Sequence, residues 1–219
     1  MPLNLGDEMP NFPCDTTAGQ IRLHDYFGDS WGILFSHPAD YTPVCTTELG
    51  VAAKLAPEFA KRGVKMIAIS CDPVDSHNGW IKDIQAYSGI HGNWPYPIIS
   101  DPNRDLAVKL GMLDDLEKDK AGLPLTARAV YVVGPDKKIK LSILYPATTG
   151  RNFNEILRVI DSLQLTVNKK VATPVNWEQG GECLVLPTVS KDDAKRLFPN
   201  HKTKEVPSGK GYIRITPQP

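Results

Sequence analysis

Short apolar runs alternate along this chain with segments whose apolar residues recur every three or four positions. The short runs predict strands at 21–23, 31–36, 64–70 and 98–100, and a hairpin of 127–133 with 138–145 around the turn at 134–137. The helical spacing predicts helices at 46–62, 76–87 and 152–164. This alternation predicts an α/β fold.

Proline, glycine and capping residues predict where the helices begin and end. Pro57 lies inside the helix at 46–62 and predicts a kink or break there, and Gly63 ends that helix. Asp101 is the expected cap of a further helix, with Pro102 at its first position and Gly111 as its stop.

A break in the pattern near residues 171–177, followed by the polar stretch 178–181, divides the chain. We expect a domain at 1–170 with the element order of a thioredoxin-like sandwich, and a small C-terminal α+β extension at 171–219. The extension shows strand patterns at 183–186 and 212–215 and a short helix capped by Ser190. Because so small a unit rarely builds its own core, we expect it to pack on the main domain or on a partner subunit.

Composition narrows the classes of function. The chain has 219 residues, of which 41% are hydrophobic and 23% charged, as in ordinary globular proteins. Lys+Arg and Asp+Glu both total 25, so the basic excess of a general nucleic-acid binder is missing. The N-terminus has no secretory pattern, and no stretch approaches the roughly 18 apolar residues of a membrane span. We therefore expect a cytoplasmic protein that does not bind nucleic acid.

The four cysteines, Cys14, Cys45, Cys71 and Cys183, form neither a C-x-x-C pair nor a zinc-like cluster with histidine. We expect four thiols, with no structural disulfide, metal or cofactor. Cys45 stands apart, because the loop after the apolar run at 31–36 leads through it into a helix. The free N–H groups and dipole of a helix N-terminus favour a thiolate. Cys45 is therefore the predicted nucleophile, whereas Cys71, at the end of a strand pattern, is interpreted as a small buried side chain.

The residues around Cys45 resemble a known family. Pro38, Thr42 and Cys45 form the string P-x-x-x-T-x-x-C, which is similar to the active-site motif of the peroxiredoxins. The resemblance extends over almost the whole chain and is to the one-cysteine branch of that family. Its further blocks are His37 and residues 46–49, 126–128, 141–152 and 217–219.

This resemblance implies an enzyme that reduces hydrogen peroxide and organic hydroperoxides, including phospholipid hydroperoxides. It implies that Cys45 is the peroxidatic nucleophile, that Thr42 and Arg128 bind and polarise the peroxide, and that Pro38 shields the thiolate. Glu48 is then expected to orient Arg128. An always-charged arginine beside a helix N-terminus suits this chemistry, because it favours a thiolate that remains nucleophilic.

Each of these residues also has a simpler interpretation. Arg128 in a strand pattern would suit a solvent-facing charge, and Thr42 an ordinary loop hydroxyl. His37 would suit either a structural position or one beside the sulfur.

The reduction cycle needs a second thiol. Many peroxiredoxins carry a resolving cysteine in a late V-C-P block, but the comparable stretch here is Ala172-Thr173-Pro174, and Cys183 lies well beyond it. An external thiol is therefore expected. The resemblance suggests glutathione, delivered by a glutathione transferase, with thioredoxin or ascorbate as alternatives. It also implies a homodimer or larger assembly, for which the strand at 138–145 could pair edge to edge with its copy.

A second motif, Gly28-Asp29-Ser30-Trp31-Gly32, matches G-x-S-x-G. Ser30 precedes its strand, whereas the serine of a nucleophile elbow follows one, so a glycine-rich turn is the simpler interpretation. The same branch is credited with calcium-independent phospholipase A2 activity, whose proposed triad aligns with Ser30, His24 and Asp136. The sequence therefore leaves three function classes open: a thiol peroxidase, a hydrolase in peripheral contact with phospholipid, and a redox-sensing chaperone.

Because no resolving cysteine traps the sulfenic acid, we expect excess peroxide to carry Cys45 on to the sulfinic and sulfonic acids. Mass spectrometry after peroxide treatment should show added oxygens on the peptide that contains Cys45. A dominant disulfide between Cys45 and Cys183 would contradict this prediction.

Overall fold

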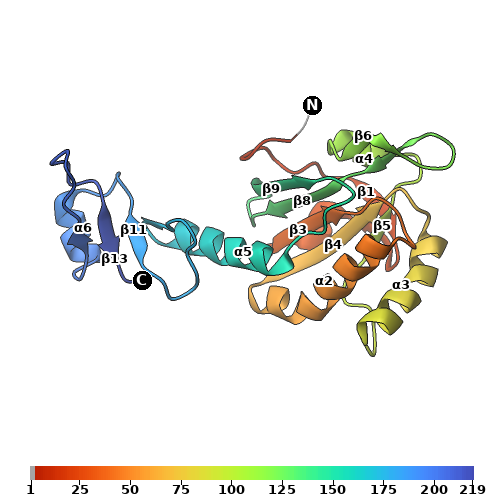
Figure 1. Ribbon diagram of the computed structural model, residues 1–219, viewed down its shortest axis with the longest axis horizontal. Helices are drawn as coiled ribbons and strands as arrows, with labels where there is room; N and C mark the ends of the chain where they lie inside the picture. The colour runs from red at the N-terminus through yellow and green to blue at the C-terminus, as the bar shows by residue number, and fades with distance from the viewer. Residues whose placement is uncertain (1–2) are drawn as a thin grey trace. The chain divides into compact units, whose positions relative to one another are not determined.

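The computed structural model describes residues 3–219 (Figure 1). Contacts divide the chain into one compact unit that ends at Phe153 and a second at 154–219. This division places the helix that starts at Phe153 almost wholly in the second unit, and the domain boundary expected at residue 170 stays a prediction. Among the described residues, no helix combines the length and the apolar character needed to cross a bilayer.

Seven strands form the sheet of the first unit: β1 (Pro13–Thr16), β2 (Gly19–Arg22), β3 (Trp31–Ser36), β4 (Val64–Ser70), β5 (Ile98–Ser100), β8 (Arg128–Val133) and β9 (Ile139–Tyr145). Their order is β2-β1-β5-β4-β3-β8-β9. The three central strands β5, β4 and β3 are parallel, and the pairs outside them are antiparallel. Strand β9 is therefore the last strand of the sheet, a position that the expected edge-to-edge pairing with a second copy requires.

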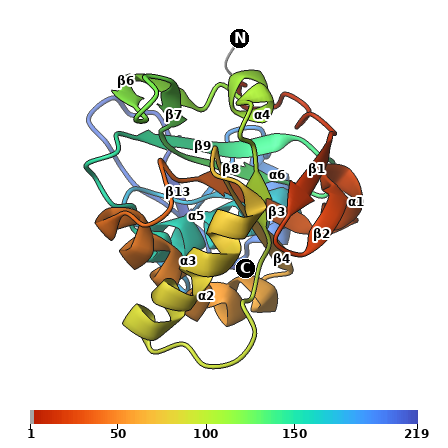
Figure 2. The same cartoon turned by 90° about the vertical axis from the view of Figure 1, so that its right-hand side faces the viewer.

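Helices lie on both faces of this sheet. They are α1 (Leu23–Phe27), α2 (Pro43–Lys61), α3 (Val74–Ser88) and α4 (Asp105–Lys109), and a small hairpin of β6 (Leu113–Lys118) with β7 (Pro124–Thr126) follows them. In both views α2 and α3 lie side by side on one face, with α4 and β6 on the opposite side (Figures 1 and 2). Strands covered on both faces need apolar residues at consecutive positions, as in the buried run Ile33-Leu34-Phe35 of β3. This packing makes β3 a rigid support for the loop that follows it.

The predicted strands at 31–36, 64–70 and 98–100 are confirmed, as are the hairpin and the helices around 46–62, 76–87 and 152–164. The expected break at Pro57 is wrong, because α2 continues through it to Lys61. Proline removes only its own bond to the carbonyl four residues back, so the remaining bonds of the last turn can still form. Gly63 follows the helix with a positive φ of 64°, as predicted.

Several predicted boundaries need correction. Helix α2 starts at Pro43, three residues before the expected position 46. The helix expected to start at Pro102 starts at Asp105, because Arg104 adopts a left-handed conformation with φ of 66°. The Asp101 carboxylate still caps it, accepting hydrogen bonds from the backbone N–H groups of Leu106 (3.2 Å) and Ala107 (2.7 Å). The strand expected at 21–23 is β2, which ends at Arg22, because Leu23 begins α1.

The second unit has an α+β composition. Its elements are α5 (Phe153–Asn168), β10 (Val171–Ala172), β11 (Cys183–Val185), α6 (Lys191–Leu197), β12 (Lys202–Thr203) and β13 (Arg214–Thr216). The strands form a sheet in the order β10-β11-β13-β12. Ser190 caps α6 by accepting a hydrogen bond from the N–H of Asp193, as predicted. A small apolar cluster that includes Trp177, Cys183 and Phe198 forms a core within this unit.

Candidate active site

Cys45 lies at the start of α2, directly after the loop that leaves β3. It is the third residue of the helix, and its side chain is fully buried. No acidic residue occupies the first turn, so no carboxylate there opposes the positive end of the helix dipole. Thr42 stands immediately before the helix, and its hydroxyl donates to the Ala39 carbonyl (2.9 Å). Pro38 is buried at the start of this loop. The sequence-based placement of Cys45 in a helix N-terminus is confirmed.

A buried arginine reaches the Cys45 sulfur. The Nη1 group of Arg128, the first residue of β8, lies 3.3 Å from Sγ and donates to it. The same Nη1 donates to Glu48 Oε2 (2.6 Å), and the guanidinium also donates to the Ala147 carbonyl. Arg128 is only 2% exposed, so it is not the solvent-facing strand residue that its position would also have suited. Glu48 holds Arg128, as expected.

A second arginine completes this network. Arg151 donates from Nε and Nη2 to the two oxygens of Glu48 (2.9 and 2.8 Å), and its backbone N–H donates to Oε1 (2.6 Å). Its guanidinium also lies over the rings of Phe35 and Phe153, at 5.7 and 5.6 Å from their centroids. Sequence reasoning assigned Arg151 no role. Its place in the 141–152 block was the one available signal, and a block match does not show which atoms an arginine contacts.

The charges of this network do not cancel. Two buried guanidinium groups share the single carboxylate of Glu48, which leaves one positive charge in excess next to the Cys45 sulfur. Burial by itself raises the pKa of Glu48, but the hydrogen bonds and charge of Arg151, with the charge of Arg128, outweigh it and hold that pKa below its usual value. Glu48 is therefore ionised at neutral pH. A thiolate on Cys45 would balance the remaining charge.

A second buried carboxylate holds the loop before Cys45. Asp40 accepts hydrogen bonds from His37 Nε2 (2.9 Å), His77 Nδ1 (2.7 Å) and the Ser76 hydroxyl (2.8 Å). Burial acts to raise its pKa, but the bonds from the two histidines outweigh that and hold the pKa well below the usual range. The next residue, Tyr41, has a positive φ of 54°, a strained conformation for a non-glycine residue. The hydrogen bonds of Asp40 on one side of Tyr41 and α2 on the other keep this sharp turn in place.

His37 bonds to Asp40 through Nε2, its buried Nδ1 has no hydrogen-bond partner, and no described hydrogen bond joins it to the sulfur. With Asp40 and His77 it forms the one group in residues 3–219 whose ligand atoms lie close enough to hold a metal ion. The atoms are spaced as hydrogen-bonding partners, at 2.7 and 2.9 Å from Asp40. Ligands around a zinc ion, each at about 2.0–2.2 Å from it, lie more than about 3 Å apart. The geometry is that of a hydrogen-bonded cluster.

The other three cysteines differ from Cys45. All are buried free thiols. Burial raises the pKa of Cys14 and of Cys71 to about 11 in each case, and it also raises the pKa of Cys183. These thiols are therefore protonated at neutral pH and are poor nucleophiles.

The three residues of the proposed hydrolase triad are not joined to one another. His24 Nε2 bonds to the Met9 carbonyl (2.6 Å), and Asp136 accepts from Lys140 Nζ (2.6 Å) in its exposed turn. Ser30 lies in the turn before β3. No hydrogen bond of the described chain links any two of Ser30, His24 and Asp136. The turn interpretation of G-x-S-x-G accounts for what the structure shows here.

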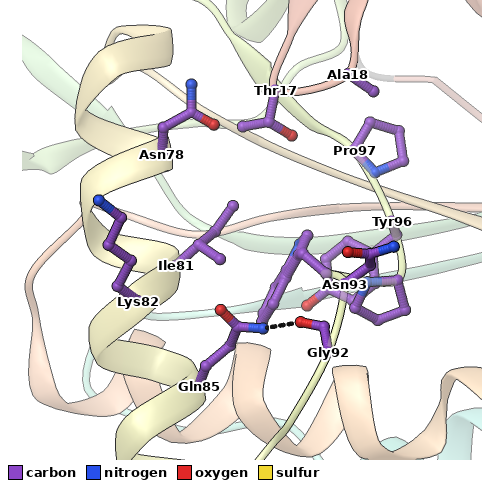
Figure 3. Close-up of a pocket in the computed structure, with 12 residues that line it drawn as sticks. Thr17, Ala18, Asn78, Ile81, Lys82, Gln85, Gly92, Asn93, Tyr96 and Pro97 are labelled. Atoms are coloured by element: carbon purple, nitrogen blue, oxygen red, sulfur yellow. Dashed lines mark hydrogen bonds between the residues drawn. The ribbon is translucent and has the colours of Figure 1, made fainter.

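A cavity of about 510 Å³ lies between α3 and the segment 92–97 (Figure 3). Its lining includes Asn78, Gln85 and Tyr96, and Gln85 donates across it to the Gly92 carbonyl (2.8 Å). None of the predicted site residues lines it. The charged groups around Cys45 therefore identify the reactive cysteine, and this cavity does not.

Comparisons with known proteins agree with this geometry. Residues 5–142 match the AhpC/TSA family, and residues 162–201 match the C-terminal domain of 1-Cys peroxiredoxin. Bovine Peroxiredoxin-6 is 67% identical, covering 99% of this chain and 98% of that protein. The C45S mutant of the Peroxiredoxin 6 of Arenicola marina is 61% identical, with 99% of each chain covered and a TM-score of 0.98. A yeast mitochondrial 1-Cys peroxiredoxin is 46% identical, with 98% of this chain and 99% of that chain covered and a TM-score of 0.90.

The thioredoxin-like fold, with a buried cysteine at the N-terminus of α2 and a buried arginine from β8 beside it, defines a thiol-dependent peroxidase. The chain belongs to the AhpC/TSA family, in its one-cysteine peroxiredoxin branch.

The Glu48 network generates a stability prediction. Glu48→Gln should lower the free energy of unfolding by about 3–5 kcal/mol at pH 7, because two buried arginines lose their counter-charge. A carboxylate whose pKa is depressed on folding stabilises above its unfolded pKa of about 4.3, and that contribution is lost as the pH falls through the folded pKa. The difference from the native chain should therefore shrink below about pH 4.

Urea unfolding of both proteins across this pH range is the measurement. Glu58→Gln, at an exposed site on the same helix, is the matched control and should change stability far less. A Glu48→Gln protein as stable as the control would show that the network does not carry this energy.

Proposed function

We propose that Cys45 is the peroxidatic nucleophile of this enzyme. The observation that carries the proposal is the 3.3 Å contact between Arg128 Nη1 and Cys45 Sγ, in a network with one positive charge in excess. An arginine that stays charged and a helix N-terminus both favour the thiolate. The raised pKa values of Cys14, Cys71 and Cys183 leave those thiols unsuited to the role.

The reaction follows from this arrangement. The thiolate attacks one oxygen of the peroxide, the O–O bond breaks, and the second oxygen leaves as hydroxide or alkoxide. Sulfur is oxidised to Cys45 sulfenic acid while the peroxide is reduced. Arg128 and the Thr42 hydroxyl are the donors that stabilise the charge developing across the O–O bond, while Pro38 limits access of water. Hydrogen peroxide and organic hydroperoxides, including those of phospholipids, are the proposed substrates.

An external thiol then returns Cys45 to the reduced state. The stretch 172–174 carries no cysteine, and the pKa of Cys183 is raised, so neither offers a resolving thiolate. Glutathione, with or without a glutathione transferase, is the proposed reductant. The yeast mitochondrial relative supports this choice, because its thiol resolving mechanism operates via glutathione/thioredoxin systems. Four free thiols suit a reducing compartment such as the cytoplasm, which is part of this proposal.

Peroxide and lipid assays on matched variants test the nucleophile. Cys45→Ser should reduce peroxide turnover to the uncatalysed background, because a serine hydroxyl is a much weaker nucleophile at neutral pH. Cys183→Ser also loses one thiol but should retain full turnover with glutathione. Full activity in a folded Cys45→Ser protein would refute the proposal.

The variant Ser30→Ala is tested in the same peroxide and lipid assays. It should leave hydrogen peroxide reduction unchanged, since Ser30 takes no part in the Cys45 network. Fatty-acid release from phospholipid that requires Ser30, and survives Cys45→Ser, would establish the hydrolase alternative. Release that Ser30→Ala leaves intact would exclude the G-x-S-x-G motif as its source. Circular dichroism should confirm that each variant is folded.

We also propose that the enzyme is at least a homodimer, joined through the edge strand β9. This strand carries Leu144, a residue that is 64% exposed, next to the partly exposed Tyr145. Residues 6–9 hydrogen-bond only to the start of β9, through Ile139 and the residues just before it. The later part of the strand keeps an open edge, and an open edge with exposed apolar residues favours pairing with a second copy. Leu144→Glu should therefore shift sedimentation at micromolar concentration toward the monomer, because like charges would face each other across the two-fold axis.

Leu116→Glu is the matched control for this experiment. Leu116 is 92% exposed on β6, away from β9, so the substitution should leave the assembly unchanged. A native chain that sediments as a monomer would contradict the proposal.

A further inference from the structure

The second unit contains a cavity of about 500 Å³ that the peroxidase chemistry does not use. All the residues that line it belong to 154–219, among them Lys191, Lys195 and Arg214. Three of them are cations at neutral pH, and none is acidic. The cavity is therefore a concentrated region of positive charge in a chain whose net charge is zero.

Arg214 is the unusual member of this set, because it is 92% buried and has no counter-charge. Its relative exposure is 8%, and its guanidinium donates to the carbonyls of Leu186 (2.6 Å) and Val189 (2.8 Å). With a longer contact to the Ser190 carbonyl (3.5 Å), these bonds engage only part of the five guanidinium donors and leave its charge unbalanced. No carboxylate of the described residues forms an ion pair with it. Buried charges are ordinarily paired. A bound anion would supply what the chain does not.

Two lysines add to the positive charge that lines this cavity. Lys191 and Lys195 lie one turn apart on α6, so both side chains can reach the same side of the helix. Neither makes a described hydrogen bond or ion pair. Two acids, Asp192 and Asp193, lie on the same helix, and neither lines the cavity. Asp193 is engaged by Arg196 (2.8 Å) and by the Ser190 cap. The cavity is thus lined by two ammonium groups without a described partner and by one buried guanidinium.

We propose that this cavity binds the phosphoryl group of a phosphate-bearing ligand. A phosphate monoester carries between one and two negative charges at neutral pH and three acceptor oxygens, so it can meet Lys191, Lys195 and Arg214 together. A single carboxylate would leave most of the positive charge unbalanced. Val189, Pro187 and Tyr212, which also line the cavity, can contact a less polar part of the ligand. The site lies in a different unit from Cys45 and does not depend on the peroxidase assignment.

Direct binding measurements on the full-length reduced chain test this proposal. The soluble probe is inorganic phosphate, followed by titration calorimetry at low ionic strength. The membrane probe is a phosphatidylcholine vesicle containing phosphatidic acid, followed by co-sedimentation. The native chain should bind at least one of the two saturably. The variant Lys191→Gln/Lys195→Gln should bind at least about tenfold more weakly, since it loses two charge-assisted bonds. Both side chains are exposed, so this variant should fold normally.

The matched control is Lys118→Gln/Lys120→Gln, which removes the same charge from exposed positions in the first unit. It should bind as the native chain does. Binding of soluble phosphate would identify a soluble ligand, and vesicle binding that only the Lys191/Lys195 variant loses would identify a lipid headgroup. The proposal is overturned if the native chain binds neither probe saturably, or if both variants lose binding equally.

Discussion

The active site depends on one carboxylate that two buried arginines share. Glu48, in the second turn of α2, accepts hydrogen bonds from Arg128 at the start of β8 and from Arg151 just before α5. Burying three charges is costly unless each has a partner and well-made hydrogen bonds, and these three have both. The arrangement ties the helix that carries Cys45 to the sheet, and it leaves one positive charge unbalanced at the sulfur. The same ion pairs of Glu48 therefore hold α2 against the sheet and set the charge beside the Cys45 sulfur.

The segment before Cys45 is held in a similar way. Asp40 accepts from two buried histidines and a serine, and its backbone N–H donates to Asp72 (3.0 Å). The strained conformation of Tyr41 lies between this anchor and α2. A strained residue persists only where its surroundings over-determine it. Thr42 and Cys45 are thus positioned by one buried carboxylate on each side of the turn, and the hydrogen bonds of each carboxylate keep the loop from relaxing.

Buried arginines have different hydrogen-bond partners in the two units. In the first unit, Arg128 and Arg151 have a carboxylate partner, and the remaining charge faces the reactive sulfur. In the second unit, Arg214 has backbone carbonyls as its acceptors and faces a cavity with two lysines. The first arrangement favours an anion that belongs to the chain, whereas the second leaves room for one that does not. Buried arginine therefore suits two functions. In the first unit its counter-charge comes from groups of the chain itself, and in the second unit it would come from a bound ligand.

The sequence by itself determined the features that depend on neighbouring residues. The apolar runs of β3 and β4, the amphipathic spacing of α5, the turn at 134–137 and the position of Cys45 at a helix N-terminus all follow from local pattern. The motif around Cys45 added the expectation that Glu48 orients Arg128. Boundaries such as the start of α4 were missed, because the left-handed Arg104 carries no turn signal of its own.

Only the tertiary structure decided which distant groups meet. Arg128 is 83 residues from Cys45, and Arg151 is 103 residues from Glu48. An arginine in a strand pattern suits solvent as well as a buried ion pair, and a histidine suits a structural cluster as well as a catalytic one. Local pattern records the preference of a segment for a conformation. Burial and charge pairing arise only when segments from different parts of the chain pack together. All four thiols are buried, and it is the contact with Arg128 that separates Cys45 from the other three.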